Sequence, residues 1–450
     1  MKKLILVLCI LFAAAGMFIS ADGTAGPAPT PVINFGNTAW LIVATALVMF
    51  MTVPSLGLFY GGLVRRKNVL SILMQSFITL AVVSLIWVAF GYSLAFSDTE
   101  FIPGVLGDLK WAFLNGIDPG QVSPYAISQP VERIPHLVFI MFQCMFAVIT
   151  PALIIGAFAE RIKFSSFLIF TIAWEVIVYI PVAHMVWSTN GFLAKLGALD
   201  FAGGTVVHIN AGIAALVTCL VIGKRKNTKT NPPHNLPFTL IGAAMLWFGW
   251  FGFNAGSALA ADGLSASAFM TTNTATAMAA LVWALMDWIF HKKPTILGVA
   301  TGAVAGLVAI TPAAGFVDVF GAFIIGIAVA VICWIMVVVV KNIFKYDDAL
   351  DAFGVHGIGG MVGAILTGVL ANPAVWKPFG GSYAGAAYGN PVQILYQLAA
   401  VGISIAVSGI GTFLIFKVID LIMGVRVAEK EEAMGLDITQ HNERGYTIVE

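Results

Sequence analysis

Charged residues are scarce in this chain: only 10% of its 450 residues are Asp, Glu, Lys or Arg. Hydrophobic residues make up 59%, and the mean hydropathy is +0.94. A soluble domain of this size needs more charge to keep its surface hydrated. The composition therefore excludes a soluble globular protein and predicts a polytopic membrane protein that lies in a lipid bilayer. The net charge of +1 gives no indication of a nucleic-acid partner.

Cysteines are few, and the common enzyme motifs are missing. The four cysteines, Cys9, Cys144, Cys219 and Cys333, lie in apolar runs without the spacing of a metal site or a disulfide. We interpret them as small buried hydrophobic residues. The chain has no G-x-x-x-x-G-K-[ST] motif and no kinase or hydrolase signature. These absences predict a protein that is not an enzyme, has no cofactor and is not driven directly by ATP.

The N-terminus has the pattern of a secretory signal. Lys2 and Lys3 precede a short apolar run, which ends in small residues near Ala21. We expect residues 1–21 to be a signal peptide; the alternative is a short first span that is not cleaved. Residues 22–37 are rich in Gly, Pro and Thr and are expected to form an extracytoplasmic leader.

Eleven apolar segments follow between residues 38 and 423, each near or above the roughly 20 residues that span a bilayer. Their predicted limits are 38–63, 69–96, 134–158, 165–187, 201–223, 236–258, 266–290, 295–312, 315–340, 352–371 and 391–423. The last is the longest and spans only with tilt or with one end protruding. Residues 424–450 form a polar C-terminal tail. The sequence thus predicts an all-α fold with eleven transmembrane helices.

Basic residues are concentrated in alternate loops. Seventeen lie on one side: Arg65, Arg66, Lys67, Arg161, Lys163, Lys224, Arg225, Lys226, Lys229, Lys292, Lys293, Lys341, Lys345, Lys417, Arg426, Lys430 and Arg444. The other side has four: Lys110, Arg133, Lys195 and Lys377. By the positive-inside rule the tail is cytoplasmic, and with eleven spans the mature N-terminus is outside. Both expectations agree with a signal peptide and with a multi-pass protein of the inner (cytoplasmic) membrane.

Four histidines lie within the predicted spans; His136 and His184 are near span ends, and His208 and His356 lie deeper. An Asp, Lys or Arg at bilayer depth costs roughly 2.5 to 3.5 kcal/mol on insertion scales, so an intramembrane ionisable residue usually faces a cavity or a partner. Val207-His208-x-x-x-Gly212 in the fifth span matches Val355-His356-x-x-x-Gly360 in the tenth. Because five spans separate them, the second unit would run inverted in the membrane, as in many transporter folds. We predict an inverted five-plus-five repeat plus a long final helix. For the two histidines, the alternative to a functional role is that they are core residues bonded to backbone carbonyls.

Asp200 precedes His208 by eight residues, or roughly 12 Å along a helix axis. This spacing places it near the outer end of the fifth span. It is either an N-terminal cap of that helix or an acid whose charge attracts a cation, and the two roles are compatible.

Aromatic residues cluster at the same outer side. They are Phe142 and Phe146 in the third span, Trp187 at the end of the fourth, and Trp247, Trp250, Phe251 and Phe253 in the sixth, where Ser257 follows one turn later. Most membrane aromatics pack or form an interfacial belt, and this explains Trp247 and Phe251. Ring faces beside a hydroxyl also form a cage that a small cation needs.

The ordered set of motifs resembles the ammonium transporter (Amt/Mep/Rh) family, bacterial Amt branch. The motifs are Gly156-Ala-Phe-Ala-Glu-Arg161, Asp200-x7-His208, Gly249-Trp-Phe-Gly-Phe-Asn-Ala-Gly-Ser257 and Phe353-Gly-Val-His356-Gly. The resemblance covers essentially the whole mature chain. It implies a homotrimer in which each eleven-helix protomer has its own pore, with ammonium or its analogue methylammonium as substrate.

The resemblance also implies roles for single residues. Trp187, Phe146 and Ser257 resemble the outer ammonium-binding site, and Phe146 with Phe253 resembles the ring gate below it.

His208 and His356 resemble the pore's histidine pair, and Asp200 the acid that recruits or deprotonates the ion. The tail motif Gly435-Leu-Asp-x3-His441-x-Glu443-x-x-Tyr446 resembles the segment that contacts a PII-type signalling protein, together with the cytoplasmic loops.

The chain departs from the family pattern at two places. The segment between Trp187 and Asp200 reads Ser-Thr-Asn-Gly where a glycine-rich loop is expected, and it is one residue longer. Glu175, inside the fourth span, matches no family motif. We expect Glu175 to lie at a subunit interface or to be a buried acid with a partner.

The predicted mechanism is binding of ammonium at the outer site, deprotonation near Asp200, and passage of ammonia along the two histidines. Whether the proton follows is open from the sequence. The alternatives are a passive channel for ammonia or carbon dioxide, a sensor that signals through the tail, and a membrane metalloenzyme. No third metal ligand lies near the histidines in sequence, so no metal site is predicted.

Overall fold

The computed structural model describes residues 30–226 and 232–446. The predicted signal peptide 1–21 and leader residues 22–29 lie outside the described residues. All contacts given below lie within one unit, Val32–Glu450. Its first helix begins at Phe35, two residues before the predicted end of the leader.

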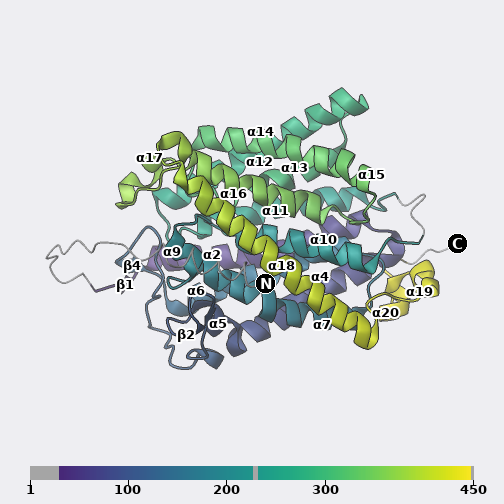
Figure 1. Cartoon of the computed structure of the whole chain (residues 1–450), viewed down its shortest axis with the longest axis horizontal. Coiled ribbons are helices and arrows are strands. Elements are labelled where there is room, and N and C mark those ends of the chain that lie inside the picture. Colours follow the sequence, from purple (N-terminus) through teal and green to yellow (C-terminus); the bar gives the residue numbers. More distant parts are fainter. Residues whose placement is uncertain (1–29, 227–231, 447–450) are drawn as a thin grey trace, which may run out of the picture. The chain divides into compact units, whose positions relative to one another are not determined.

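The first half of the unit contains five spans (Figure 1). In chain order they are α2 (Phe35–Phe50) with η1 (Met51–Leu56) and α3 (Gly57–Leu63); η2 (Arg66–Asn68) with α4 (Val69–Ile86), η3 (Trp87–Gly91) and α5 (Tyr92–Phe96); α6 (His136–Phe158); α7 (Phe164–Trp174) with η5 (Glu175–Tyr179), α8 (Ile180–Trp187) and α9 (Phe192–Leu196); and η6 (Gly204–Ile209) with α10 (Asn210–Ile222).

The second half contains five comparable spans and the long final helix. They are α11 (Leu236–Gly256); α12 (Gly263–His291); α13 (Ile296–Ile310); α14 (Val319–Trp334) with η7 (Ile335–Val340) and α15 (Lys341–Phe344); η8 (Phe353–Gly357) with α16 (Ile358–Leu370); and α18 (Val392–Met423). The tail adds α19 (Glu429–Met434) and α20 (Leu436–His441).

Short elements lie in the connections. They are η4 (Ala112–Leu114), α17 (Pro373–Trp376), η9 (Lys377–Phe379), η10 (Ala386–Tyr388) and four strands, β1 (Val32–Ile33), β2 (Glu100–Ile102), β3 (Leu106–Gly107) and β4 (Glu132–Arg133). β1 pairs with β4 in parallel, and β2 pairs with β3 in an antiparallel hairpin.

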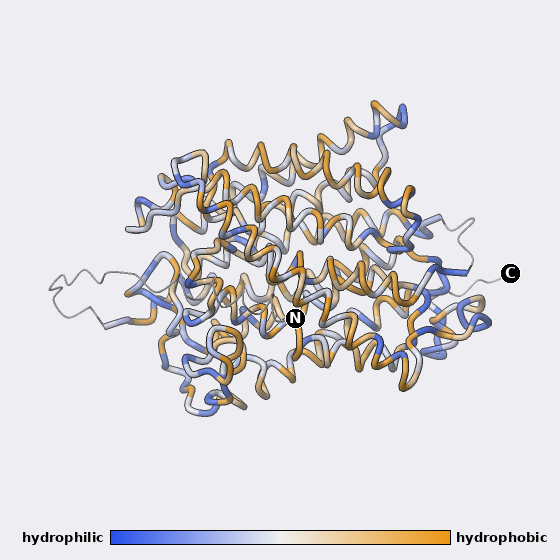
Figure 2. The backbone as a smooth tube through the Cα atoms, viewed as in Figure 1, coloured by the Kyte–Doolittle hydropathy of each residue, from blue (hydrophilic) through white to orange (hydrophobic). Residues whose placement is uncertain are grey.

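The predicted all-α membrane fold is confirmed. Within the described residues, ten helices are long and apolar enough to cross a membrane. The eleventh apolar helix is α13, which has only 15 residues and continues into a turn at Thr311. Figure 2 shows hydrophobic residues along the helical segments and hydrophilic ones gathered in the loops at both ends of the spans.

Capping residues explain where many of these helices begin. Asn34, Asn235, Asp262, Thr295 and Asp318 each accept a hydrogen bond from a backbone N–H in the first turn of the helix that follows. Such caps satisfy donors that a helix leaves open at its N-terminus. Short polar residues between apolar runs therefore set the starts of five helices.

The two ends of the bundle differ, and we name each by one residue. The Asp200 end carries α9, α17 and the short strands, and the Arg225 end carries α15 and the tail helices α19 and α20 (Figure 1). The span η6–α10 runs from the first end, after Asp200, to the second, before Arg225.

The inverted repeat is visible in the packing of η6–α10 against η8–α16. A side chain at Gly212 would collide with the backbone of Gly357, next to His356. Conversely, a Cβ at Gly360 would lie 3.1 Å from the Cβ of His208. The glycine of each V-H-x-x-x-G motif thus packs against the histidine segment of the other, so both histidine segments meet in the interior.

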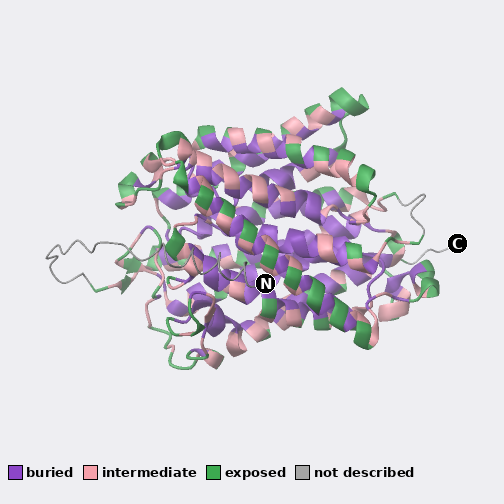
Figure 3. Ribbon diagram, viewed as in Figure 1, coloured by how far each residue is buried: buried purple, intermediate pink, exposed green. Residues whose placement is uncertain are grey.

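Glycines also allow close helix packing elsewhere. Gly252 lies against Ala44 of α2, Gly306 against α12, and a side chain at Gly363 would collide with the backbone of Ala309. Small residues at such positions let helices approach closely in lipid. Buried residues are concentrated where these helices cross, and α6 and α10 are the most buried spans (Figure 3). The site described next lies between them.

Candidate functional site

A cavity of about 150 Å³ lies at the Asp200 end. Four of the predicted site residues line it: Phe146 of α6, Trp187 at the end of α8, Asp200, and Ser257 just after α11. The other lining residues are mostly aromatic and include Tyr125, Phe139, Phe316, Trp376 and Tyr383. An aromatic cup with few polar groups attracts a small cation through its ring faces.

Two hydrogen bonds orient the polar groups of this cavity. The indole Nε1 of Trp187 donates to the carbonyl oxygen of Asp200 at 3.1 Å, and the Trp187 ring meets Phe146 edge-on with centroids 5.5 Å apart. The Ser257 hydroxyl donates to the carbonyl of Phe253 at 2.9 Å. Because its proton is engaged there, the Ser257 oxygen is left as an acceptor for a donating ligand. The longer segment before Asp200 therefore does not displace Trp187 from the cavity.

Two phenyl rings close the cavity on its inner side. The centroids of Phe146 and Phe253 are 4.3 Å apart, with planes inclined by 36°. Both rings are buried. The Phe253 ring in turn lies 6.1 Å from His208, so the pair separates the cavity from the first histidine.

His208 and His356 face each other directly. Their Nδ1 atoms are 3.3 Å apart and their ring centroids 5.4 Å apart. Both side chains are buried, and His208 also stacks on Trp250 with centroids 5.4 Å apart. Facing Nδ1 atoms form a hydrogen bond only if one carries the proton and the other accepts it. The Nε2 of His208 has no hydrogen-bond partner in the described part of the chain.

Asp200 caps the segment that carries His208. Its Oδ1 accepts from the backbone N–H groups of Gly203 and Gly204, at 2.8 and 2.6 Å. Its Oδ2 accepts from the backbone and hydroxyl of Thr205 and from the backbone of Val206. The cap predicted for Asp200 is confirmed, and the same carboxylate lines the aromatic cavity.

Asp348 repeats this arrangement before the second histidine. It precedes His356 by eight residues, as Asp200 precedes His208, and its Oδ2 accepts from the N–H of Phe353 at 2.7 Å. Its side chain is buried, and burial raises its pKa above the usual range. Sequence analysis missed Asp348, although extending the V-H-x-x-x-G match eight residues upstream reveals it.

A second cavity of about 370 Å³ lies on the far side of the histidine pair. Its lining includes His356, together with Tyr60, Trp283, Asp287 and Asp351. The order from the Asp200 end is therefore cavity, phenyl pair, His208, His356, cavity. The two imidazoles therefore lie next to each other between the two cavities and not in separate packed regions.

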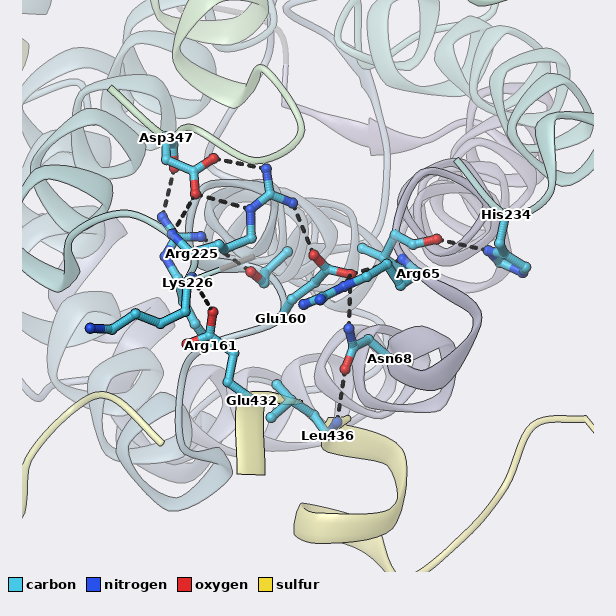
Figure 4. A network of polar contacts seen from close by, with 12 residues as sticks. Arg65, Asn68, Glu160, Arg161, Arg225, Lys226, His234, Asp347, Glu432 and Leu436 are labelled. Carbon is cyan, nitrogen blue, oxygen red and sulfur yellow. Dashed lines mark hydrogen bonds and ion pairs between the residues drawn. The ribbon is translucent and has the colours of Figure 1, made fainter. Parts of the chain in front are cut away.

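The Arg225 end is joined by a buried ion-pair network (Figure 4). Arg225 binds both oxygens of Asp347, at 2.8 and 3.0 Å, and reaches Glu160 at 2.9 Å. Glu160 also accepts from Arg65 and Asn68. Burial opposes its charge, but Arg225 and Arg65 outweigh burial and hold the pKa of Glu160 below its usual value.

Replacing Glu160 by Gln is expected to lower the free energy of unfolding by about 3 kcal/mol at neutral pH, because Arg65 and Arg225 lose a buried partner. A carboxylate with a lowered folded pKa contributes stability above its unfolded pKa and loses it as pH falls. The difference from the unmodified protein should therefore shrink below about pH 4. Thermal unfolding in detergent at several pH values measures both effects.

Glu429→Gln is the matched control, because its pair with Lys226 is exposed and 3.8 Å long. Equal destabilisation by Glu160→Gln and Glu429→Gln would contradict the network's role.

The tail docks on this network. The N–H of Leu436 donates to Asn68 at 2.8 Å, Asp437 accepts from the N–H of Ser71 at 2.9 Å, and Glu432 accepts from the N–H of Lys226 at 2.7 Å (Figure 4). The tail thereby contacts two places at the Arg225 end, the start of η2–α4 and the segment after α10.

Glu175 is buried, as one of the two expectations states, but its expected partner is not found among the described residues. Its side chain is fully buried within the protomer, so it does not lie at a subunit surface. Neither carboxyl oxygen has a hydrogen-bond partner among the described residues. Glu175 begins the π-helical segment η5, and Tyr179 at its end also has an unpartnered hydroxyl.

Some residues of the site were given no role from the sequence. Trp250, one of the outer aromatic residues, stacks on His208, and this role could have been found from its place one turn before Phe253. Tyr125 comes from a loop and Trp376 from the short connecting helix α17, and neither carries a local signal. Within the described residues, no three His, Cys, Asp or Glu side chains converge as a metal site would require.

Comparison with known proteins shows similarity over nearly the whole chain. Residues 39–446 match the model of the Ammonium Transporter Family. The chain is 49% identical to the ammonium transporter of Bacillus subtilis over 416 residues, covering 92% of this chain and 99% of that one. It is 48% identical to the ammonium transporter of Aquifex aeolicus, covering 96% and 98%.

Solved structures give the same result. The crystal structure of Saccharomyces cerevisiae Mep2 matches with a TM-score of 0.81 at 35% identity, over 91% of this chain and 95% of that one. A structure named Sensor Amt Protein matches with a TM-score of 0.80 at 26% identity, over 90% and 98%.

Proposed function

Because this chain belongs to the Ammonium Transporter Family, we propose that it transports ammonium by binding the ion in the aromatic cavity, transferring one of its protons to the unpartnered Nε2 of His208 and passing ammonia along His208 and His356. The observation that carries this proposal is the order of groups: an aromatic cavity, two phenyl rings and two facing imidazoles.

Binding favours ammonium through its charge and its hydrogens. The faces of Phe146 and Trp187 attract a cation by roughly 0.5 to 2 kcal/mol each. The Ser257 oxygen, whose own proton is donated to Phe253, accepts a hydrogen bond from the ion. Potassium has a similar size and charge, but it has no proton to donate or to lose.

Asp200 acts as a fixed negative charge beside the cavity, not as the proton acceptor. Its two oxygens already accept hydrogen bonds from four backbone N–H groups and one hydroxyl. Burial raises the pKa of Asp200, and these hydrogen bonds oppose that effect by stabilising the ionised form. Its charge holds the cation at the cavity, and its bonds keep the His208 segment in place.

The phenyl pair and the histidines separate ammonia from ammonium. An ion entering the apolar passage below Phe146 and Phe253 loses its hydration at a large cost, and neutral ammonia at a small one. The unpartnered Nε2 of His208 is available to bond ammonia or to take up the proton. Imidazole releases either one readily near neutral pH.

The test is current recording on proteoliposomes after an ammonium pulse. We expect an inward current with ammonium and methylammonium and none with potassium, because transfer of the proton with ammonia moves one charge per cycle. Each charge moved gains roughly 2.3 kcal/mol per 100 mV of membrane potential. Ammonia flux without current would instead indicate a passive gas channel. Binding without flux would indicate a sensor, the alternative favoured by the likeness to the Sensor Amt Protein.

We extend the proposal to orientation and partners. The basic loops and the docked tail at the Arg225 end support a cytoplasmic location of that end in the inner membrane. The aromatic cavity then opens outward. The exposed apolar surface of the bundle is available to lipid and to two further copies in a homotrimer. The tail helices α19 and α20 with the loops beneath them are the surface we assign to a PII-type signalling protein.

A further inference from the structure

We propose that Glu100 is a positioning residue for ammonium binding: it holds Trp187 in the aromatic cavity through a hydrogen bond to His184 that contains one proton. This inference rests on the proposed function, since it concerns the affinity of the same cavity. Glu100 lies on β2, far from the family motifs in sequence.

Residues in and next to the hairpin β2–β3 form hydrogen bonds with the chain on both sides of Trp187. Before it, the Glu100 carboxylate meets His184 on α8 at 2.9 Å. After it, the side chain of Asn190 donates to the carbonyl of Asp98, and the N–H of Phe192 donates to the carbonyl of Gly104 at 3.0 Å. Oε1 of Glu100 also accepts from the N–H of Gly104, which ties the hairpin turn to the same carboxylate.

The two hydrogen-bond partners of His184 require that a proton lies between His184 and Glu100. The Nδ1 of His184 lies 2.9 Å from the carbonyl oxygen of Ala95, which only accepts, so Nδ1 carries a hydrogen. The Nε2 faces the Glu100 oxygen at 2.9 Å. Without a proton between them, two lone pairs would oppose each other in a buried site. The pair therefore holds one proton, as imidazolium with carboxylate or as imidazole with carboxylic acid.

The Glu100–His184 pair fixes the position of the last turn of α8. The N–H of Ser188 donates to the carbonyl of His184, and Trp187 lies within that turn. The indole donates a hydrogen bond to the carbonyl of Asp200, and its ring contacts Phe146. Loss of the anchor at His184 would leave the position of the indole less constrained.

The surroundings support a charged pair. His184 is buried, and the Glu100 side chain is 16% exposed. Burial disfavours the Glu100 charge, but hydrogen bonds from His184 and Gly104 outweigh it and lower the pKa of Glu100. Lys195 of α9 adds a cation on the same side.

The other elements packed against α8 bring titratable groups that are already accounted for. α5 carries Tyr92, whose hydroxyl bonds His136, and η6 carries His208 of the pore. η5 carries Glu175 and Tyr179. α18 carries Tyr396, which lies beside Gly197, and also Lys417 and Asp420. None of these has a hydrogen bond to the Glu100–His184 pair in the described residues.

The test compares Glu100→Gln, Glu100→Ala and the unmodified protein in methylammonium uptake by proteoliposomes at neutral pH. In Glu100→Ala, KM should rise about tenfold because the indole of Trp187 is less constrained, with the maximal rate little changed. Glu100→Gln can donate its amide to neutral His184, so its KM should stay close to that of the unmodified protein.

Glu132→Gln is the control, because Glu132 is exposed on the same end and bonds only Asn34 by its side chain. It should follow the unmodified protein. A KM raised as much in Glu100→Gln as in Glu100→Ala, or an unchanged KM in Glu100→Ala, would overturn the inference. Failure of the unmodified protein to take up methylammonium would instead refute the proposed function. Elution as a single peak in gel filtration verifies that each variant is folded.

Discussion

Replacing His208 or His356 by alanine is expected to reduce the ammonium-driven current at least 100-fold, the order of magnitude of a lost proton-transfer group. Each variant removes one half of the Nδ1–Nδ1 contact at 3.3 Å. The remaining imidazole then has no partner in an apolar passage that admits no hydrated ion. Current and methylammonium uptake should be measured in the same proteoliposomes, because flux without current would show that the proton has been uncoupled.

Folding should survive these substitutions. The two helices still meet through Gly212 and Gly360, and alanine fills part of the vacated space. His234→Ala is a suitable control, since His234 lies at the Arg225 end and bonds Val64 and Tyr446. Unchanged methylammonium uptake in both pore variants would disprove the role of the histidine pair.

Replacing Asp200 by alanine is expected to abolish transport and also to lower the free energy of unfolding by about 3 kcal/mol or more. The substitution leaves the N–H groups of Gly203, Gly204, Thr205 and Val206 without their acceptor. Each buried unsatisfied group costs about 1 to 3 kcal/mol, although neighbouring costs do not add fully. Uptake and thermal unfolding are the two measurements.

Asp200→Asn separates the two roles of this residue. Its amide oxygen can still accept from Gly203 and Gly204, but the negative charge is lost. We expect it to recover part of the lost stability and to bind methylammonium more weakly, with a KM raised about tenfold. Full transport by Asp200→Asn at unchanged KM would reduce Asp200 to a helix cap.

The bundle could be predicted because its causes are local. Hydrophobic length predicts spans, and alternate basic loops predict which ends lie together. The repeat was found in the V-H-x-x-x-G motifs because the close approach of the two segments needs glycine at both Gly212 and Gly360. Family motifs added Phe146, Trp187, Phe253 and Ser257, which all lie around one cavity or its inner wall.

Other features could not be predicted because they depend on contacts between distant segments. Asp348 matches Asp200 in its distance from the histidine, but only the structure shows that it is buried and accepts from the N–H of Phe353. The bond between Glu100 and His184 joins positions 84 residues apart. Glu175 was expected to have a partner because buried charges usually do, yet none of the described neighbours of its carboxyl group provides one.

The sequence by itself determined that this protein is a bundle of apolar helices with one V-H-x-x-x-G motif in each half and a family relation to ammonium transporters. Apolar length, charge asymmetry and short motifs act along the chain, so they can be read from it. Only the tertiary structure decided that the two imidazoles face each other between two cavities, that Asp200 is fully bonded as a cap, and that Glu100 anchors the helix bearing Trp187. These facts depend on directions and distances between side chains, which arise only when the helices cross.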